Sequence, residues 1–181
     1  PDQAAQKCVY GGRGGGAYDD VPVEASNVVF DSMATIKGLT VAATAGLGEQ
    51  AAAGVPPHWN SYVSVDDIEA TAAKVAPAGG TVIAPPFDVL DAGRMAVVQD
   101  PTGAIFELWQ AKNNIGASLV NEPGTFSWSE LLTPDVPKAA EFYDKLLGWG
   151  SETKGEGMPY TEFQLDGNSI AGAMNPPMPG I

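Results

Sequence analysis

A carboxylate within an apolar segment is the first feature of this chain that could do chemistry. Glu107 stands in the apolar run of residues 105–108, two residues before Trp109. If Glu107 lies in an apolar site without a metal ion, its pKa should rise, which makes it a candidate general base or hydrogen-bonding anchor. The alternative is a structural carboxylate that is hydrogen-bonded on the inner face of a strand.

The only histidine belongs to a second candidate group. His58 is followed at alternate positions by Asn60 and Tyr62 in a segment rich in aromatic and β-branched residues. Because side chains alternate along a strand, these three residues share one face, and we expect them to line a ligand-binding surface. A histidine beside two prolines is also typical of a capping or packing residue, and this alternative stays open.

Two tryptophans complete the candidate ligand-binding residues. Trp128 and Glu130 alternate with Leu132, which predicts an aromatic and carboxylate surface on one strand face. Trp109 is grouped with them because it follows the segment of Glu107. Burial in the core is the alternative for each of these tryptophans.

The elements that must position these residues follow one order, β-α-β-β-β. In the middle of the chain we expect a helix at residues 68–75, capped by Asp66 or Asp67 and stopped by Pro77 and two glycines. The expected strands are residues 58–65, 81–84, 94–99 and 104–109, with a loop over residues 85–93 and a tight turn at residues 100–103.

The same order recurs towards the end of the chain. A strand is expected at residues 125–132, then a helix at 136–147 capped by Thr133 or Asp135 and ended by Gly148, then strands at 160–165 and 169–174. The beginning of the chain fits a helix over residues 2–10 and strands over 28–36 and 40–45, without room for a leading strand.

An internal repeat supports this interpretation. Pro134-Asp135, Tyr143 and Gly148 recur at one constant offset from Pro1-Asp2, Tyr10 and Gly15. A repeat of this kind indicates copies of one supersecondary unit. We therefore predict an α+β protein with an incomplete first module at residues 1–55, a second module at 56–112, and a third module with its linker at 113–181.

Composition restricts the partners. The chain has 181 residues, with 22 acidic and 9 basic side chains and a formal net charge of −13, which argues against nucleic acid. No apolar run is long enough for a spanning helix, and no signal peptide is recognised, so we expect no membrane partner and a cytoplasmic location. The single cysteine, Cys8, cannot form an intrachain disulfide.

Several motifs together resemble one superfamily. The segment of residues 65–70, the Gly79-Gly80 pair, and the run from Asp100-Pro101-Thr102-Gly103 to Glu107-Leu108 are similar to the vicinal oxygen chelate superfamily, which includes glyoxalase I, bleomycin-resistance proteins and extradiol dioxygenases. The resemblance covers essentially the whole chain. It implies βαβββ modules whose antiparallel and mixed sheets form cups that hold ligands, as in the first three modules of a four-module member.

The resemblance also implies where a metal ion would bind. Metal enzymes of the superfamily take His, Gln and Glu ligands from inward-facing positions on the first and last strands of their modules. Glu107 matches a last-strand ligand position, but the first-strand positions fall on Asn60 and Trp128. Three or more converging donors are usual for such metals, so one Glu with one His is a poor set. We therefore expect no bound metal, with a divalent metal at Glu107 as the alternative.

Two functional classes remain open. The first is a bleomycin-resistance-like protein that binds a small aromatic or cationic molecule without a metal. The second is a divalent-metal-dependent lyase or dioxygenase of the glyoxalase or extradiol type, in which Glu107 is a metal ligand or a base. A truncated fragment without activity is a third interpretation. Unpaired sheet edges and an open half-cup predict a homodimer, with the third module of one chain closing against the other chain.

Overall fold

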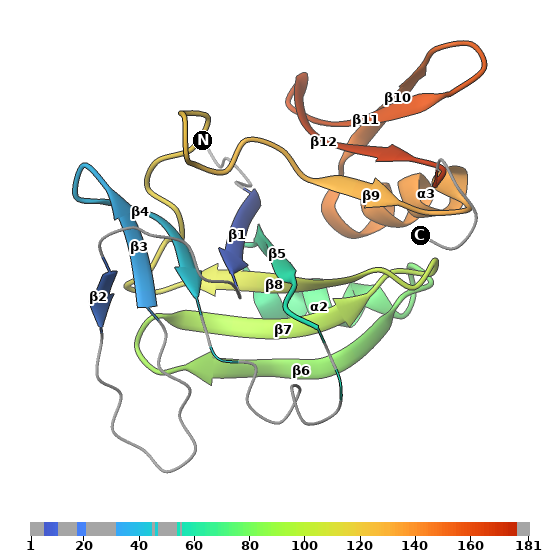
Figure 1. Cartoon of the computed structure of the whole chain (residues 1–181). Helices are drawn as coiled ribbons and strands as arrows, with labels where there is room; N and C mark the ends of the chain where they lie inside the picture. The colour runs from blue at the N-terminus through green and yellow to red at the C-terminus, as the bar shows by residue number, and fades with distance from the viewer. Residues whose placement is uncertain are drawn as a thin grey trace. The chain divides into compact units, whose positions relative to one another are not determined.

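The computed structural model describes residues 6–10, 18–20, 32–44, 46, 54 and 56–176, with the backbone alone for the first two segments (Figure 1). The chain divides into two compact units. The larger unit comprises Pro1–Gln6, Val63–Asn113 and Trp128–Ile181, and the smaller unit comprises Lys7–Tyr62 and Asn114–Ser127. The module boundaries at residues 55 and 112 stay a prediction, because a compact unit groups residues that are close in space and not residues of one sequence repeat.

The middle of the chain has the expected β-α-β-β-β order. Strand β5 passes from the smaller into the larger unit, and the strands follow each other in the order β5-β8-β7-β6, with antiparallel β6–β7 and β7–β8 pairs. The elements are β5 (Trp59–Ser64), α2 (Ile68–Val75), β6 (Thr81–Val89), β7 (Gly93–Gln99) and β8 (Ile105–Ala111).

Helix α2 has the bounds that the sequence predicts. Asp67 is its N-cap, and the Asp67 carboxylate accepts a hydrogen bond of 2.9 Å from the backbone N–H of Ala70. Ile68, Ala72 and Val75 are the buried residues of the helix. Their spacing places them on one face, so burial of that face holds α2 on its sheet.

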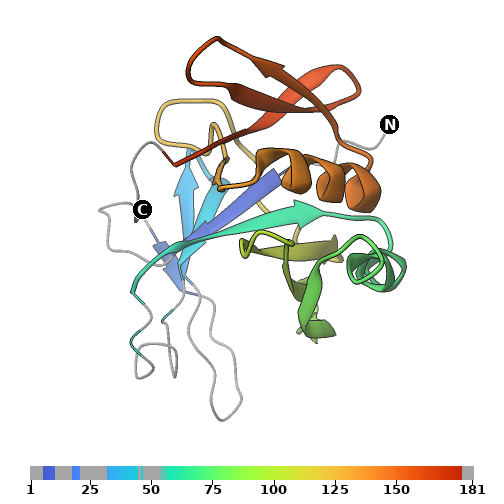
Figure 2. The same cartoon turned by 90° about the vertical axis from the view of Figure 1, so that its right-hand side faces the viewer.

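The end of the chain repeats the same order. Its elements are β9 (Glu130–Leu132), α3 (Val136–Leu147), β10 (Gly150–Lys154), β11 (Tyr160–Leu165) and β12 (Asn168–Met174). They form a sheet of order β10-β11-β12-β9, in which β12 and β9 are parallel and the other pairs antiparallel. Figure 2 shows α3, in orange, beneath this sheet. The predicted α+β class with repeated βαβββ units is therefore confirmed.

Helix α3 is limited by a cap at each end. The Asp135 carboxylate accepts a hydrogen bond of 3.1 Å from the backbone N–H of Lys138, and Pro137 lies in the first turn. Gly148 ends the helix with φ 70°, a left-handed conformation that glycine adopts without steric cost. The sequence predicts both ends correctly, because each depends on a local signal.

An aromatic core joins the second and third repeats within the larger unit. Phe142 and Tyr143 of α3 pack against Phe106 of β8, with ring centroids 6.3 and 5.5 Å apart. Tyr143 also stacks on Trp149 at 5.5 Å. Phe142 is almost fully buried, and truncating such a ring to alanine costs about 3–5 kcal/mol.

The Asp100 turn also connects these repeats. The buried Asp100 carboxylate accepts hydrogen bonds at Oδ1 from the backbone N–H of Thr102 (2.7 Å), the Thr102 hydroxyl (2.8 Å) and the backbone N–H of Ala104 (3.0 Å). Its Oδ2 accepts a hydrogen bond of 3.3 Å from the Tyr143 hydroxyl. Burial and the Asp100 charge raise the pKa of Tyr143 well above its usual value, so this hydroxyl stays a donor.

The smaller unit corrects the prediction for the start of the chain. Residues Gln6–Tyr10 form strand β1 and not the expected helix, while residues 2–5 lie outside the described residues. Strand β1 pairs in parallel with β4 (Leu39–Thr44), as β9 pairs with β12, so a leading strand is present. Cys-Val-Tyr at residues 8–10 has strand-forming side chains, which outweighs the repeat as a local signal. The other strands here are β2 (Tyr18–Asp20) and β3 (Ser32–Ile36).

The largest differences between the predicted and observed strands are in β6, β9 and β10. Strand β6 continues through Pro85 and Pro86 to Val89, where a loop was expected, because β6 is the last strand of its sheet and an edge strand tolerates proline. Strand β9 is shorter than residues 125–132. The sequence does not predict β10, since all five of its residues are exposed and it lacks an apolar alternation. None of the described helices is long and apolar enough to cross a membrane.

Candidate functional site

Glu107 lies on the face of β8 that is opposite to the aromatic core. Its neighbours Phe106 and Leu108 belong to the core, so the Glu107 side chain points to the other face of the sheet. On that face Glu107 pairs directly with Val97, and Trp109 pairs with Met95 of β7. Strands β7 and β8 thus place one carboxylate among apolar side chains.

The protonation of Glu107 is perturbed by burial. Only 5% of Glu107 is exposed, and its Oε2 is buried with no hydrogen-bond partner among the described residues. Burial raises the pKa of Glu107 from 4.5 to about 7, against a smaller lowering by a backbone hydrogen bond. Near pH 7 this carboxyl can therefore either donate or accept a proton, as a general acid or base requires.

A glycine on the neighbouring strand leaves the space that the Trp109 indole occupies. A Cβ atom added at Gly93 would overlap the six-membered ring of the Trp109 indole and the carbonyl of Gln110. The missing side chain of Gly93 therefore lets the indole lie against the backbone of β7. Sequence reasoning missed Gly93, because the need for glycine arises from a cross-strand neighbour that is distant in the sequence.

Glu130 is the first residue of β9 in the other sheet of the larger unit, and Trp128 lies two residues before it. The Trp128 Nε1–H donates a hydrogen bond of 2.9 Å to the hydroxyl of Tyr160 on β11. Gly172 of β12 leaves the space for this contact, since a Cβ there would meet both rings. Glu130 is exposed and pairs in register with Gly172. The sequence predicts Trp128 and Glu130 together but misses Tyr160.

A polar network on β10, β11 and β12 was not predicted either. Glu162 of β11 accepts a hydrogen bond of 2.8 Å from the Ser169 hydroxyl and lies 3.6 Å from the Lys154 ammonium group. Lys154 is also 3.0 Å from Glu152. Glu162 alternates with Tyr160, so the period-two pattern of β11 was the signal that could have found both residues.

The first-strand candidates belong to the smaller unit. His58 is exposed, and its Nδ1 lies 2.9 Å from the carbonyl oxygen of Pro56. In the tautomer with its hydrogen on Nδ1, the ring donates a hydrogen bond to this oxygen. This contact agrees with the capping alternative. Asn60 and Tyr62 of β5 are partly buried and share one strand face. The larger unit thus brings together Glu107 with Trp109, and Trp128 with Glu130, while His58, Asn60 and Tyr62 lie in the other unit.

Potential metal ligands are few around Glu107 in the described part of the chain. Among the residues that the structure describes, no group of three or more His, Cys, Asp and Glu side chains could hold one. Glu107 and Val97 are cross-strand partners, so the side chain directly opposite Glu107 on β7 is apolar. The chemistry that these residues offer is that of the Glu107 carboxyl itself.

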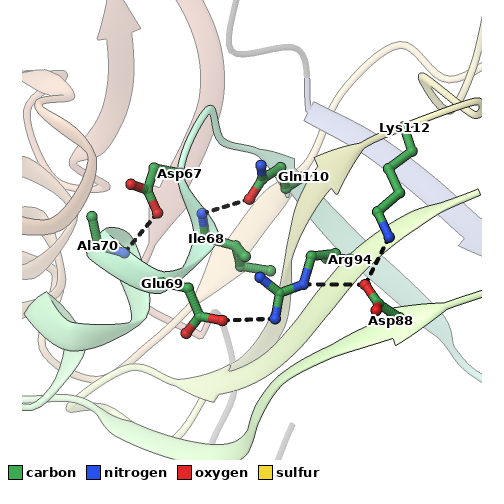
Figure 3. A network of polar contacts seen from close by, with 8 residues as sticks. All are labelled: Asp67, Ile68, Glu69, Ala70, Asp88, Arg94, Gln110 and Lys112. Atoms are coloured by element: carbon green, nitrogen blue, oxygen red, sulfur yellow. Dashed lines mark hydrogen bonds and ion pairs between the residues drawn. The ribbon is translucent and has the colours of Figure 1, made fainter.

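Polar contacts connect helix α2 with strands β6, β7 and β8 (Figure 3). The Arg94 guanidinium of β7 lies 2.6 Å from Glu69 of α2 and 3.2 Å from Asp88 of β6. Lys112 donates a hydrogen bond of 2.8 Å to Asp88, and this contact lowers the pKa of Asp88. The Gln110 side chain accepts a hydrogen bond of 3.0 Å from the backbone N–H of Ile68. Arg94 thus connects β7 with α2 and β6, and Gln110 connects β8 with α2.

Comparisons with known proteins support a common origin. A family model described as Glyoxalase/Bleomycin resistance protein/Dioxygenase superfamily matches residues 27–108. Proteins named "Putative glyoxylase CFP32" from Mycobacterium bovis and Mycobacterium tuberculosis are 46% identical over 182 residues, covering 99% of this chain and 69% of theirs. The anthracycline biosynthesis protein DnrV of Streptomyces peucetius is 38% identical over 120 residues, covering 66% of this chain and 44% of its own length.

Solved structures share the fold at low sequence identity. The Mn(II)-bound glyoxalase from Novosphingobium aromaticivorans is 17% identical, with a TM-score of 0.60, over 93% of this chain and 55% of that chain. BphC, a halotolerant catechol dioxygenase, is 12% identical, with a TM-score of 0.56, over 88% of this chain and 57% of that chain. The chain thus spans little more than half the length of these two proteins.

Proposed function

The chain belongs to the glyoxalase/bleomycin resistance protein/dioxygenase superfamily, and from this premise we propose that it binds a small flat aromatic or cationic molecule at Glu107 without a metal ion. The observation that carries the proposal is the buried Glu107 carboxyl, whose Oε2 has no partner in the described part of the chain. An unsatisfied buried oxygen favours a ligand that donates a hydrogen bond to it.

The surroundings of Glu107 favour a ligand with an apolar body. Trp109 and Met95 form one cross-strand pair beside the pair of Glu107 and Val97. Sites for small molecules typically combine such apolar walls with a few polar groups that fix orientation. The net charge of −13 adds a weak preference for a cation.

The ionisation of Glu107 gives the proposal a pH dependence. Below its pKa of about 7 the carboxyl is neutral, and above that value it is an anion. A cationic aromatic ligand should therefore bind more tightly as the pH rises through 7, since the ion pair forms in a buried place. An uncharged analogue of equal shape should not gain affinity over the same range.

A matched pair of probes tests the proposal by titration calorimetry. We expect naphthylmethylamine to bind more tightly at pH 8 than at pH 6, while naphthylmethanol does not gain affinity. The variant Glu107→Gln keeps the shape of the side chain and should remove the preference for the amine, which we expect to be about tenfold or more. Equal binding of the amine by the variant and the parent protein at pH 8 would rule out Glu107 as the anchor.

Metal analysis separates this proposal from the lyase or dioxygenase alternative. Purified protein should contain no stoichiometric transition metal, and Ni, Zn, Fe and Mn salts should not raise its melting temperature. A stoichiometric metal that is lost in Glu107→Gln would instead favour the metal enzyme, because Glu107 would then be a ligand.

A further inference from the structure

A groove lies on the helix side of the last sheet, away from the surface of Trp128 and Tyr160. Helix α3 forms one wall with Ala140, Glu141 and Asp144, and strands β10 and β11 form the other with Thr153 and Thr161. Its volume is about 530 Å³, within the usual range for small-molecule sites. Thr161 and Tyr160 are consecutive on β11, so the groove and the Trp128 surface are on opposite faces of the sheet.

A buried donor without a partner lies in the wall of this groove. Trp149 lines the groove, is 2% exposed, and has an indole N–H with no hydrogen-bond acceptor among the described residues. Buried N–H groups are nearly always paired, because an unpaired donor loses its hydration without compensation. An acceptor that reaches Nε1 would therefore gain the full benefit of one hydrogen bond.

The remaining polar groups of the groove define the chemistry of a ligand. The hydroxyls of Thr153 and Thr161 lie 2.7 Å apart and offer both donors and acceptors. The carboxylates of Glu141 and Asp144 stand on exposed positions of α3. The Lys145 ammonium group lies 2.6 Å from the Glu141 carboxylate. Asp144 takes no part in this ion pair, so we consider its carboxylate the one that a cationic ligand would contact.

We propose that this groove is a second binding site, for small polyhydroxylated amines. The ammonium group of the ligand lies at Asp144, and a ligand oxygen accepts the hydrogen bond of the Trp149 indole. Nε1 is buried in the free protein, so the proposed contact requires a local rearrangement of the Trp149 side chain or of the groove wall. The site is independent of Glu107, which lies on the other side of the aromatic core.

The test is an NMR titration of ¹⁵N-labelled protein with glucosamine, and with glucose as the uncharged control. The indole N–H signal of Trp149, assigned by its loss in Trp149→Phe, should move at millimolar glucosamine and move clearly less with the same concentration of glucose, which lacks the ammonium group. Asp144→Asn should weaken glucosamine binding about two- to fivefold, as expected for an exposed ion pair. Ala140→Phe, which fills the groove, should abolish the shift.

Matched variants keep the result interpretable. Glu107→Gln should leave the glucosamine shift unchanged, so a failure at one site is distinguishable from a failure at the other. The proposal is overturned if the Trp149 signal does not move, if glucose moves it equally, or if Ala140→Phe and Asp144→Asn both bind glucosamine like the parent. Asp144→Asn changes an exposed side chain, so it remains informative if Trp149→Phe does not fold.

Discussion

Two buried carboxylates of the larger unit differ in their partners. Asp100 is buried with three donors at Oδ1 and the Tyr143 hydroxyl at Oδ2, whereas Glu107 is buried with an unpartnered oxygen among the described residues. A buried polar group that is fully paired stabilises the fold, and one that is not fully paired costs stability unless it has another role. We therefore expect Asp100 to stabilise the fold, and Glu107 stays the proposed functional carboxyl.

The stability of the protein should depend on the ionisation of Glu107. The folded-state pKa of about 7 exceeds the ordinary value of 4.5, so the stabilising contribution is complete below pH 4.5 and is lost as the pH rises through 7. The difference between these two pKa values corresponds to at most about 3 kcal/mol. Urea unfolding at pH 5 and pH 8 should show that Glu107→Gln loses less stability than the parent protein between the two pH values. The same loss in both proteins would contradict burial of the charge.

Removing the Asp100 carboxylate should be costly. Asp100→Ala leaves buried donors of Thr102, Ala104 and Tyr143 without an acceptor, and we expect a loss of about 3–5 kcal/mol in the free energy of unfolding. Tyr143→Phe removes only one of these hydrogen bonds, and should cost about 1 kcal/mol. Chemical denaturation of both variants gives the comparison. A similar small loss in both would mean that the turn does not depend on Asp100.

At the scale of elements, the helix ends could be predicted because the residues that cap a helix lie next to its ends in the sequence. The caps Asp67, Asp135 and Gly148 lie at the predicted start of α2 and at the two predicted ends of α3. Strand β10 and the extension of β6 were missed, because exposed polar residues and prolines join a sheet only through their neighbours. The same limit explains the site. Glu107 was recognised from one apolar segment, whereas Tyr160, Gly93 and the Trp149 groove depend on contacts between distant segments.

The helix caps offer a test at this scale. Asp135→Ala removes the acceptor for the backbone N–H of Lys138, and should lower the free energy of unfolding by about 1 kcal/mol. Asp135→Ser retains a capping oxygen and should recover most of the loss. Thermal unfolding measures both variants, and an Asp135→Ala variant as stable as the parent would show that Pro137 and burial of α3 alone fix the helix start.

At the scale of the whole molecule, the sheet of β9 to β12 has an exposed face. Trp128 and Leu132 are 39% and 44% exposed there, and the edge strand β9 has only three residues. Apolar side chains on an open sheet favour association. We predict a homodimer by light scattering at micromolar concentration, which Trp128→Arg should convert to monomer. A monodisperse monomer of the parent protein would contradict this prediction.

The central claim is that Glu107 is a buried carboxyl, incompletely paired and available to a ligand. The most direct measurement is the pH titration of its carboxyl ¹³C chemical shift, identified by its absence in Glu107→Gln. We predict a midpoint near 7, where burial places the pKa, and a displaced midpoint when naphthylmethylamine is bound. A midpoint near 4.5 without ligand would show a solvated or fully paired carboxylate, and would contradict the claim.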